Sequence, residues 1–112
     1  NGNLTSGDKS ISLSDTNNFS NDFVGSIFSV KSFGKVHTIT MWLNITKALT
    51  AGTLYNIAST DIAPNELATG IGYCNSEKAI IVRIWSDGNI SIIPTVNISA
   101  GGQFQASITF IK

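Results

Sequence analysis

Two tryptophans lie among polar residues and are the side chains best placed to contact another molecule. Trp42 alternates with threonine and asparagine, and Trp85 lies close to Arg83 and Asn89 along the chain. An aromatic plane flanked by hydroxyl, amide and guanidinium groups suits a sugar, whose apolar C–H face stacks while its hydroxyls are hydrogen-bonded. The same combination is typical of contacts between subunits. A third interpretation is simple packing as a second layer of the core. The sequence leaves all three interpretations open, with a subunit contact favoured for both tryptophans.

One further aromatic side chain and the single imidazole of the chain complete the candidate set. His37 could act as a base towards a serine, but it begins the core-facing set of an alternating stretch. We therefore interpret it as a histidine at the edge of the core or facing a neighbouring subunit. The candidate saccharide-contacting residues are Trp42, Trp85, Arg83, Tyr73, His37 and Asn89.

Other chemistry has little support. The carboxylates are scattered over predicted loops and turns, whereas a glycosidase needs two facing one another across a bond. One cysteine and one histidine make no metal site, and Cys74 is expected to be a small buried hydrophobic residue. Gly70-Ile71-Gly72 has no helix after it to form a phosphate loop. We expect no enzyme activity, no cofactor and no bound metal.

Asn-x-Ser/Thr triplets start at five asparagines and would suit a glycosylated secreted protein. So many serines, threonines and asparagines produce most such triplets by chance, and we interpret them as coincidence. The five are Asn3, Asn18, Asn44, Asn89 and Asn97.

Length and composition narrow the class of protein. The chain has 112 residues, zero formal net charge and 12% charged residues. This length is typical of one domain with its own core. Without a basic run or a long apolar stretch, neither nucleic acid nor membrane insertion is expected. The single cysteine excludes an internal disulfide.

The clearest periodicity runs from Val36 to Thr46, where apolar residues alternate with polar ones in a β-branched stretch. Period two over this length predicts a half-buried strand. A two-residue Gly34-Lys35 turn before it predicts a hairpin that pairs Val30 with Ile39 and Phe28 with Met41.

A second hairpin is predicted through Ser86-Asp87-Gly88. A two-residue turn would mix the two faces of the strands. A three-residue loop closed by Gly88 in the left-handed conformation instead pairs Ile84 with Ile90 and Val82 with Ile92, and we choose this register.

Alternation also predicts a strand at the C-terminal end, and shorter strands elsewhere. Together they indicate an all-β fold, a small antiparallel Greek-key barrel or sandwich of about seven or eight strands, expected to assemble as a trimer. Residues 1–21 are polar and weakly patterned and are expected to be an arm or linker from an upstream stalk, with residues 22–112 as the barrel. The further strands are predicted at Ser10–Ser14, Thr53–Ala58, Ala68–Cys74 and Phe104–Ile111.

The order of these elements carries a resemblance. It runs from the Gly34-Lys35 turn and Val36–Thr46 through a proline-containing loop at 61–66 to the Asp87-Gly88 hairpin and the aromatic C-terminal strand. From residue 22 to residue 112 this resembles the C-terminal head domain of receptor-binding and baseplate proteins of tailed phages that infect Gram-positive bacteria, the lactococcal phage type in particular. No single motif is diagnostic, because the match is one of pattern and order.

The resemblance implies a β-barrel head that forms a homotrimer at the tip of a tail fibre or baseplate and binds host cell-wall saccharide. It implies location in the virion and contact with other tail or baseplate proteins. None of the family's sugar-contacting residues can be transferred by motif, and the sparse carboxylates and single histidine depart from what a sugar site usually offers. Two alternatives remain open: a structural trimerisation or baseplate-assembly module, and a carbohydrate-binding module of a secreted bacterial protein.

Overall fold

The computed structural model describes residues 4–6, 11–14, 18–20, 27–75 and 77–112. These residues form an all-β fold in which every strand pairing is antiparallel. The sequence predicts about seven or eight strands. The described residues form ten, of which seven have six residues or more and three shorter ones come from the first twenty residues. The strands are β1 (Leu4–Ser6), β2 (Ile11–Leu13), β3 (Phe19–Ser20), β4 (Ile27–Phe33), β5 (Val36–Ile45), β6 (Tyr55–Thr60), β7 (Ala68–Cys74), β8 (Lys78–Ile84), β9 (Asn89–Pro94) and β10 (Gln103–Ile111).

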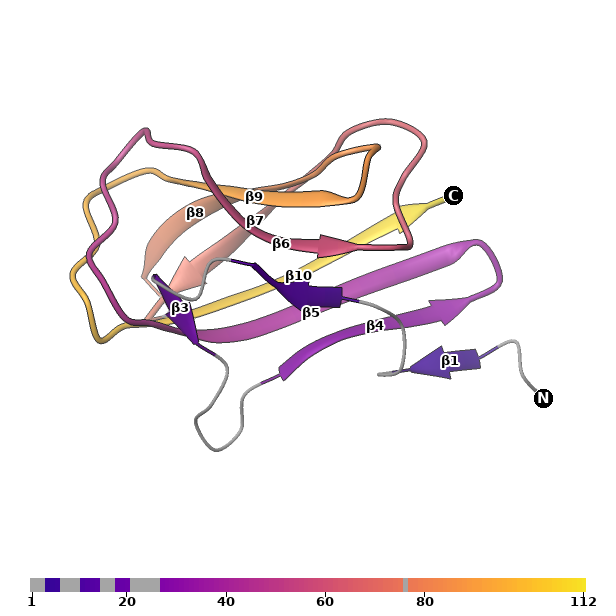
Figure 1. Ribbon diagram of the computed structural model, residues 1–112, viewed down its shortest axis with the longest axis horizontal. Helices are drawn as coiled ribbons and strands as arrows, with labels where there is room; N and C mark the ends of the chain where they lie inside the picture. Colours follow the sequence, from indigo (N-terminus) through magenta and orange to yellow (C-terminus); the bar gives the residue numbers. More distant parts are fainter. Residues whose placement is uncertain (1–3, 7–10, 15–17, 21–26, 76) are drawn as a thin grey trace.

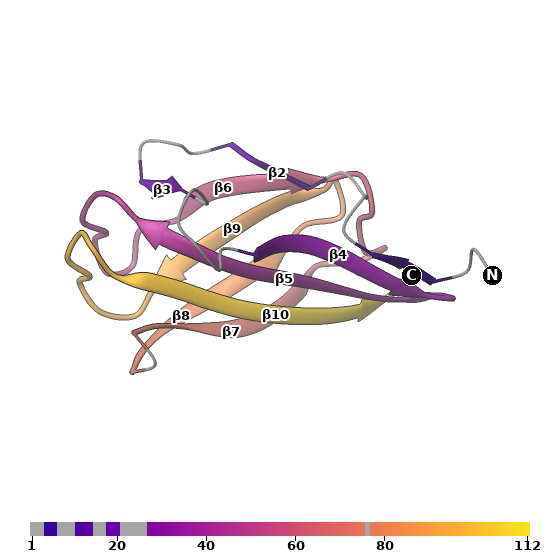
Figure 2. The same ribbon diagram turned by 90° about the horizontal axis from the view of Figure 1, so that it is seen from below.

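The strands make one curled sheet in the order β1-β4-β5-β10-β7-β8-β9-β6-β2. β3 pairs with the part of β5 beyond β4, on the same edge of that strand. The sheet curls until β2 contacts β4, which gives a nearly closed barrel (Figures 1 and 2). The predicted all-β, barrel-like class is confirmed.

The core fills the inside of this barrel with alternate side chains of the long strands. On β5 the buried side chains run from Ile39 to Ile45, and on β10 they run from Phe104 to Phe110. Because β5 and β10 pair directly, Ile39 lies opposite Ile108 and Leu43 opposite Phe104. Full burial of each large apolar side chain contributes about 1.5–3 kcal/mol. The polar alternates therefore point out of the barrel.

The first hairpin has the predicted register. A two-residue turn that begins at Gly34, with a φ of 62°, joins β4 to β5. Val30 pairs with Ile39, and Phe28 pairs with Met41. Glycine adopts this φ at little cost, so the turn fixes which residues face the core.

The second hairpin also has the predicted register. Ile84 pairs with Ile90, and Val82 pairs with Ile92. Gly88 closes the loop with a φ of 95°. The register of the three-residue loop is therefore confirmed. It keeps the apolar residues of both strands on one face, and that face is buried.

β6 differs from its prediction. The expected strand Thr53–Ala58 lies two residues further on, at Tyr55–Thr60. A turn through Gly52, with a φ of 77°, precedes it. The register shifts between Asn56 and the next paired residue, so that Ile57 and Ala58 are both buried. A bulge of this kind interrupts the alternation on which the prediction depended.

The N-terminal stretch also differs from the arm or linker expected for residues 1–21. β2 pairs with β6, and β3 pairs with β5. Phe19 is fully buried and its ring packs edge-on against Phe104, with centroids 6.4 Å apart. The strand predicted at Ser10–Ser14 is present as β2, but β3 has only two residues and shows no alternation, which is why the buried Phe19 was missed. Ser10 of the predicted Ser10–Ser14 strand lies outside the described residues.

Replacing Gly88 with alanine should destabilise the fold more than the same change at Gly101. Both have nearly the same φ, 95° and 96°, but a Cβ at Gly88 would collide with the Thr60 carbonyl while Gly101 has open space. We expect Gly101→Ala to lower the free energy of unfolding by about 1–2 kcal/mol. Gly88→Ala should cost at least about 1 kcal/mol more. Urea denaturation measures both, and equal losses would contradict the packing described.

Candidate functional site

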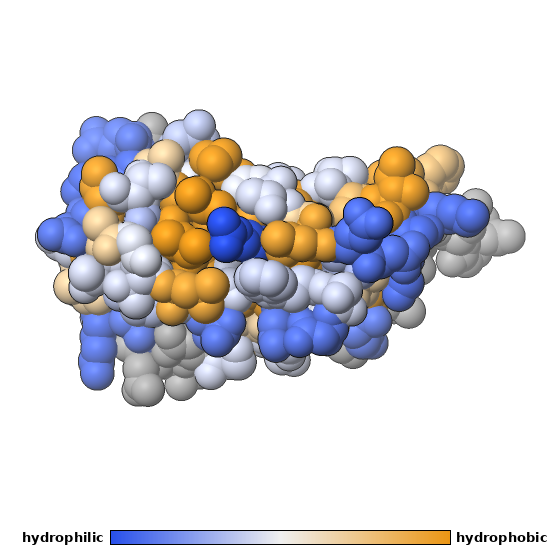
Figure 3. Space-filling model, turned by 90° about the horizontal axis from the view of Figure 1, so that it is seen from above, coloured by the Kyte–Doolittle hydropathy of each residue, from blue (hydrophilic) through white to orange (hydrophobic). Residues whose placement is uncertain are grey.

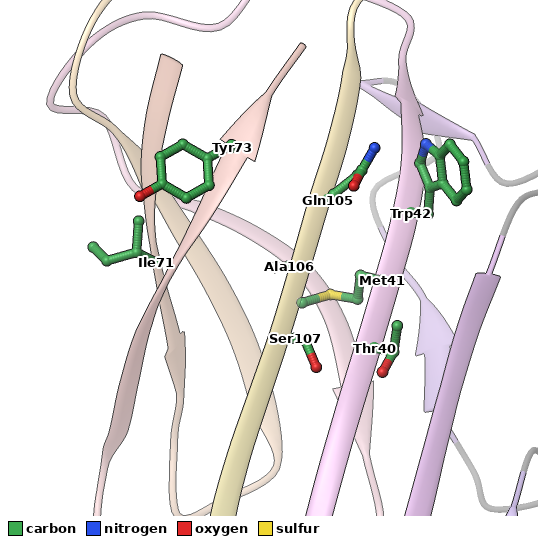
Figure 4. A pocket seen from close by; sticks show the side chains of 8 residues that line it. All are labelled: Thr40, Met41, Trp42, Ile71, Tyr73, Gln105, Ala106 and Ser107. Carbon is green, nitrogen blue, oxygen red and sulfur yellow. The ribbon is translucent and has the colours of Figure 1, made fainter. Parts of the chain in front are cut away.

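A groove lies on the outer face of the barrel, between the adjacent strands β5 and β10 and the strand β7, which pairs with β10 at Phe104 and Gln105 and diverges from it beyond them (Figure 4). Gln105 of β10 is the register partner of both Trp42 on β5 and Tyr73 on β7. The three side chains therefore form one row across three strands. The strands that carry the two rings are two strand spacings apart, about 10 Å. Tyr73 and Trp42 lie on opposite sides of Gln105.

The groove is polar along its middle and contains no charged side chain. Ser107 pairs with Thr40 in the next outward row and adds two hydroxyl groups beside the Gln105 amide. The volume of the groove is about 480 Å³. Its lining residues are Thr40, Met41, Trp42, Ile71, Tyr73, Gln105, Ala106 and Ser107.

Two glycines set the position of the β7 wall of the groove. A Cβ at Gly70 would collide with the Ile108 side chain, and one at Gly72 would collide with Phe104 and the β10 backbone. Glycine at both positions lets β7 pack closely against β10. Ile71 and Tyr73, on the alternate positions, then point outwards and are each 48% exposed. Gly70-Ile71-Gly72 therefore has a packing role, which the sequence did not reveal.

The structure brings together Trp42 and Tyr73 from the predicted set. Trp42 is half-buried at one side of the groove, and Tyr73 is exposed at the other. Gln105 and Ser107 lie between them and were missed as candidates. Their alternation with core residues of the last strand did place them on the outer face. The sequence could not show that this strand lies between the two aromatic side chains.

Trp85 lies on the β8–β9 part of the barrel, where hydrogen bonds hold its side chain in place. Its indole N–H donates to Ser91 Oγ at 3.0 Å, and the Ser91 hydroxyl donates to Asn56 Oδ1 at 2.7 Å. Ser91 is fully buried. Because its polar atom is already bonded and its ring is half-buried, Trp85 has a structural role in this chain.

Arg83 lies beside this tryptophan on the same outer face. It pairs with Ser91 on β9 and Thr69 on β7 and is half-buried. Within the described part of the chain, its buried Nε has no hydrogen-bond acceptor. The neighbouring row of isoleucines, which joins Ile71 to Ile81 and Ile93, makes this face apolar. Figure 3 shows hydrophobic side chains gathered near the middle of the face seen from the β8 and β9 side.

Asn89 supports the turn of the second hairpin. Its backbone N–H and its side-chain amide donate to the two Asp87 carboxylate oxygens at 3.0 and 3.1 Å. Such a turn is a common structural use of Asp and Asn. Among the other triplet asparagines, Asn97 Oδ1 accepts from the Ala51 N–H at 2.9 Å, and Asn3 lies outside the described residues.

His37 lies at the edge of the core, as one of the two interpretations of its sequence position predicted. Its Nδ1 and the Ser32 hydroxyl are 2.7 Å apart. Its ring packs against Phe110 with centroids 5.5 Å apart. The imidazole is half-buried and lies outside the groove.

The described ranges, which leave out Asp8, Asp15 and Asp22, contain no cluster of three or more histidine, cysteine or acidic residues that could hold a metal. They also contain no helix long and apolar enough to cross a membrane.

Cys74 is buried at the end of β7, as predicted. Burial raises the pKa of its thiol, and the nearby Glu77 carboxylate adds to this, while the Lys78 ammonium and a hydrogen bond with the Gln103 backbone act in the opposite direction. A raised thiol pKa means less of the nucleophilic thiolate at a given pH.

Iodoacetamide should therefore alkylate Cys74 at least about 100-fold more slowly in the folded protein than in urea at pH 8. The raised pKa also favours folding while the thiol is protonated. Stability should thus fall as the pH rises above about 8.5, the ordinary thiol pKa. Mass spectrometry measures the alkylation rate. For the dependence of stability on pH, the Cys74→Ala variant is the control, because it lacks the thiol. Equal alkylation rates would show that the thiol is accessible.

Comparisons with known proteins give no relative: no family model matches the sequence, and no curated protein matches it significantly. The groove between Trp42 and Tyr73 is therefore the principal guide to function.

Proposed function

We propose that this domain is a noncatalytic receptor-binding head of a tailed phage that attaches the virion to host cell-wall saccharide through the Trp42–Tyr73 groove. The observation that carries the proposal is the row of two aromatic rings with the Gln105 amide between them. The family resemblance suggests attachment of a phage as the biological role. The residues that line the groove suggest a saccharide as the ligand.

The groove suits a sugar because it offers apolar and polar contacts in alternation. The rings provide planes for C–H faces, and Gln105, Ser107 and Thr40 provide donors and acceptors for hydroxyl groups. None of the lining side chains is a carboxylate, imidazole or amine. Hydrolysis of a glycosidic bond usually needs a pair of carboxylates, so binding without turnover is the function that these residues support.

A shallow groove of this kind predicts modest affinity at a single site. Attachment can still be strong when several copies act together, because linked sites raise the effective concentration of one another. This fits a homotrimeric head on a tail tip that carries many such heads.

The exposed apolar end of the barrel favours a second candidate, an assembly module whose main task is to hold copies or tail proteins together. Phe33 and Ile111 are 67% and 71% exposed there. A carbohydrate-binding module of a secreted bacterial protein would share the groove but act as a monomer. Glycan binding distinguishes the receptor-binding head from the assembly module. A monomeric mass distinguishes the carbohydrate-binding module from both.

Changes in the groove should abolish glycan binding without unfolding the domain. We expect Trp42→Ala, Tyr73→Ala and Gln105→Leu each to weaken binding at least about tenfold, about 1.4 kcal/mol. Gln105→Leu keeps the size of the side chain but removes its hydrogen bonds. Wild-type protein is first screened on a glycan array and on cell walls from Gram-positive bacteria, and calorimetry then measures affinity for the best ligand.

Trp85→Phe is the matched control, because it changes an aromatic residue outside the groove. It should leave the affinity unchanged while lowering thermal stability, since the hydrogen bond to Ser91 is lost. Binding that depends on Trp85 and not on Trp42 would contradict the proposed site. No binding to any glycan would leave the assembly module as the better function.

Salt should have little effect on the affinity. The groove has no charged side chain, so no ion pair with the ligand is available for screening. We expect less than about a twofold change in affinity between about 50 and 500 mM NaCl. A steep loss with salt would indicate that a charged surface, such as that around Arg83, binds the ligand instead.

A further inference from the structure

One end of the barrel carries a row of exposed apolar side chains. Phe33 pairs with Val36 across the first hairpin, and Val36 pairs with Ile111 on β10. Their exposed fractions are 67%, 42% and 71%. Side chains directly opposite on neighbouring strands lie in contact, so the three form one continuous surface. Apolar surface gathered in this way usually marks an interaction site.

Lysines surround this row. Lys31, Lys35 and Lys112 are all exposed, and the Lys112 backbone N–H donates to the Lys35 carbonyl at 2.9 Å, which holds the two residues side by side. The strands β4, β5 and β10 contain no aspartate or glutamate. We call Phe33, Val36, Ile111, Lys35 and Lys112 the basic flank.

A surface of opposite charge lies at the same end of the barrel. Asp61 and Glu66 lie in the loop between β6 and β7, and Asp87 lies in the turn between β8 and β9. All three are exposed, and Leu67 beside Glu66 is 44% exposed. We call these four residues the acidic flank. Figure 1 shows both loops, the first hairpin and the end of β10 at one end of the molecule.

We propose that copies of this chain associate side by side, with the basic flank of one copy packed against the acidic flank of the next. The apolar row would meet Leu67, and lysines would meet carboxylates. Because the two flanks are different patches at the same end of the barrel, the contact is head-to-tail and can close into a ring. The inference rests on the homotrimer of the proposed function and names its contact surfaces, but it does not depend on the glycan groove.

Light scattering after size exclusion tests the contact by charge exchange. Wild-type protein should have a mass of about three times 11.9 kDa, falling as salt rises. The variant with Lys35→Glu and Lys112→Glu, and the variant with Asp61→Lys and Glu66→Lys, should each be monomeric. The chain carrying all four changes should recover the oligomer, because the charges are again complementary. Asp87 is left unchanged because it holds the hairpin turn.

Two controls keep the outcome clear. Lys47→Glu with Glu77→Lys exchanges charges outside both flanks and should leave the mass unchanged. Phe33→Ser should dissociate the oligomer while preserving the circular dichroism spectrum, because its side chain is exposed in the single chain.

A wild-type protein that stays monomeric at every concentration would overturn the inference, and so would a four-change chain that stays monomeric. In either case the glycan affinity of the monomer, and its loss in Trp42→Ala, still tests the groove separately.

Discussion

The pairing of β5 with β10 is the constraint on which the rest of the molecule depends. Nine consecutive residue pairs, from Gln103 with Asn44 to Ile111 with Val36, fix these two strands inside the sheet, between β4 and β7. This register places Ile39, Leu43, Phe104 and Ile108 inside the barrel. It also places Trp42 beside Gln105 outside it. A slip of one residue would turn the core outwards and scatter the groove, so stability and the candidate site depend on the same register.

The two walls of the groove have different physical origins. The Trp42 wall comes from simple alternation along β5. The Tyr73 wall depends on Gly70 and Gly72, which let β7 pack against β10 more closely than residues with a Cβ could. The middle of the groove carries amide and hydroxyl groups and no charge, which fits the low charge of the whole chain. The charged side chains that form the two flanks lie instead at one end of the barrel. The molecule thus separates the neutral groove, which we propose for a saccharide, from the charged and apolar end, which we propose for a second copy.

Local patterns predicted much of the fold, because hairpin register depends on residues that are close in sequence. Gly34 and Gly88 fixed two turns, and alternation then identified the buried face of each strand. Distant relationships were not predictable. Alternation tells which way Gln105 points but not which strands lie beside β10, so the middle of the groove was missed. Phe19 was missed because its two-residue strand has no period, and the bulge at Ile57 hid the extension of β6 to Thr60. Of the candidate side chains, Trp85 and Asn89 already have hydrogen-bond partners within the chain, which the sequence could not show.

We propose that a glycan binds across Trp42 and not at Trp85. The chain has two tryptophans, so the nitrogen-15 correlation spectrum should contain two indole signals, each assignable by mutation. Titration with the cell-wall saccharide that binds best should move the Trp42 signal and leave the Trp85 signal in place. Movement of the Trp85 signal alone, or of neither signal at saturating saccharide, would contradict the account.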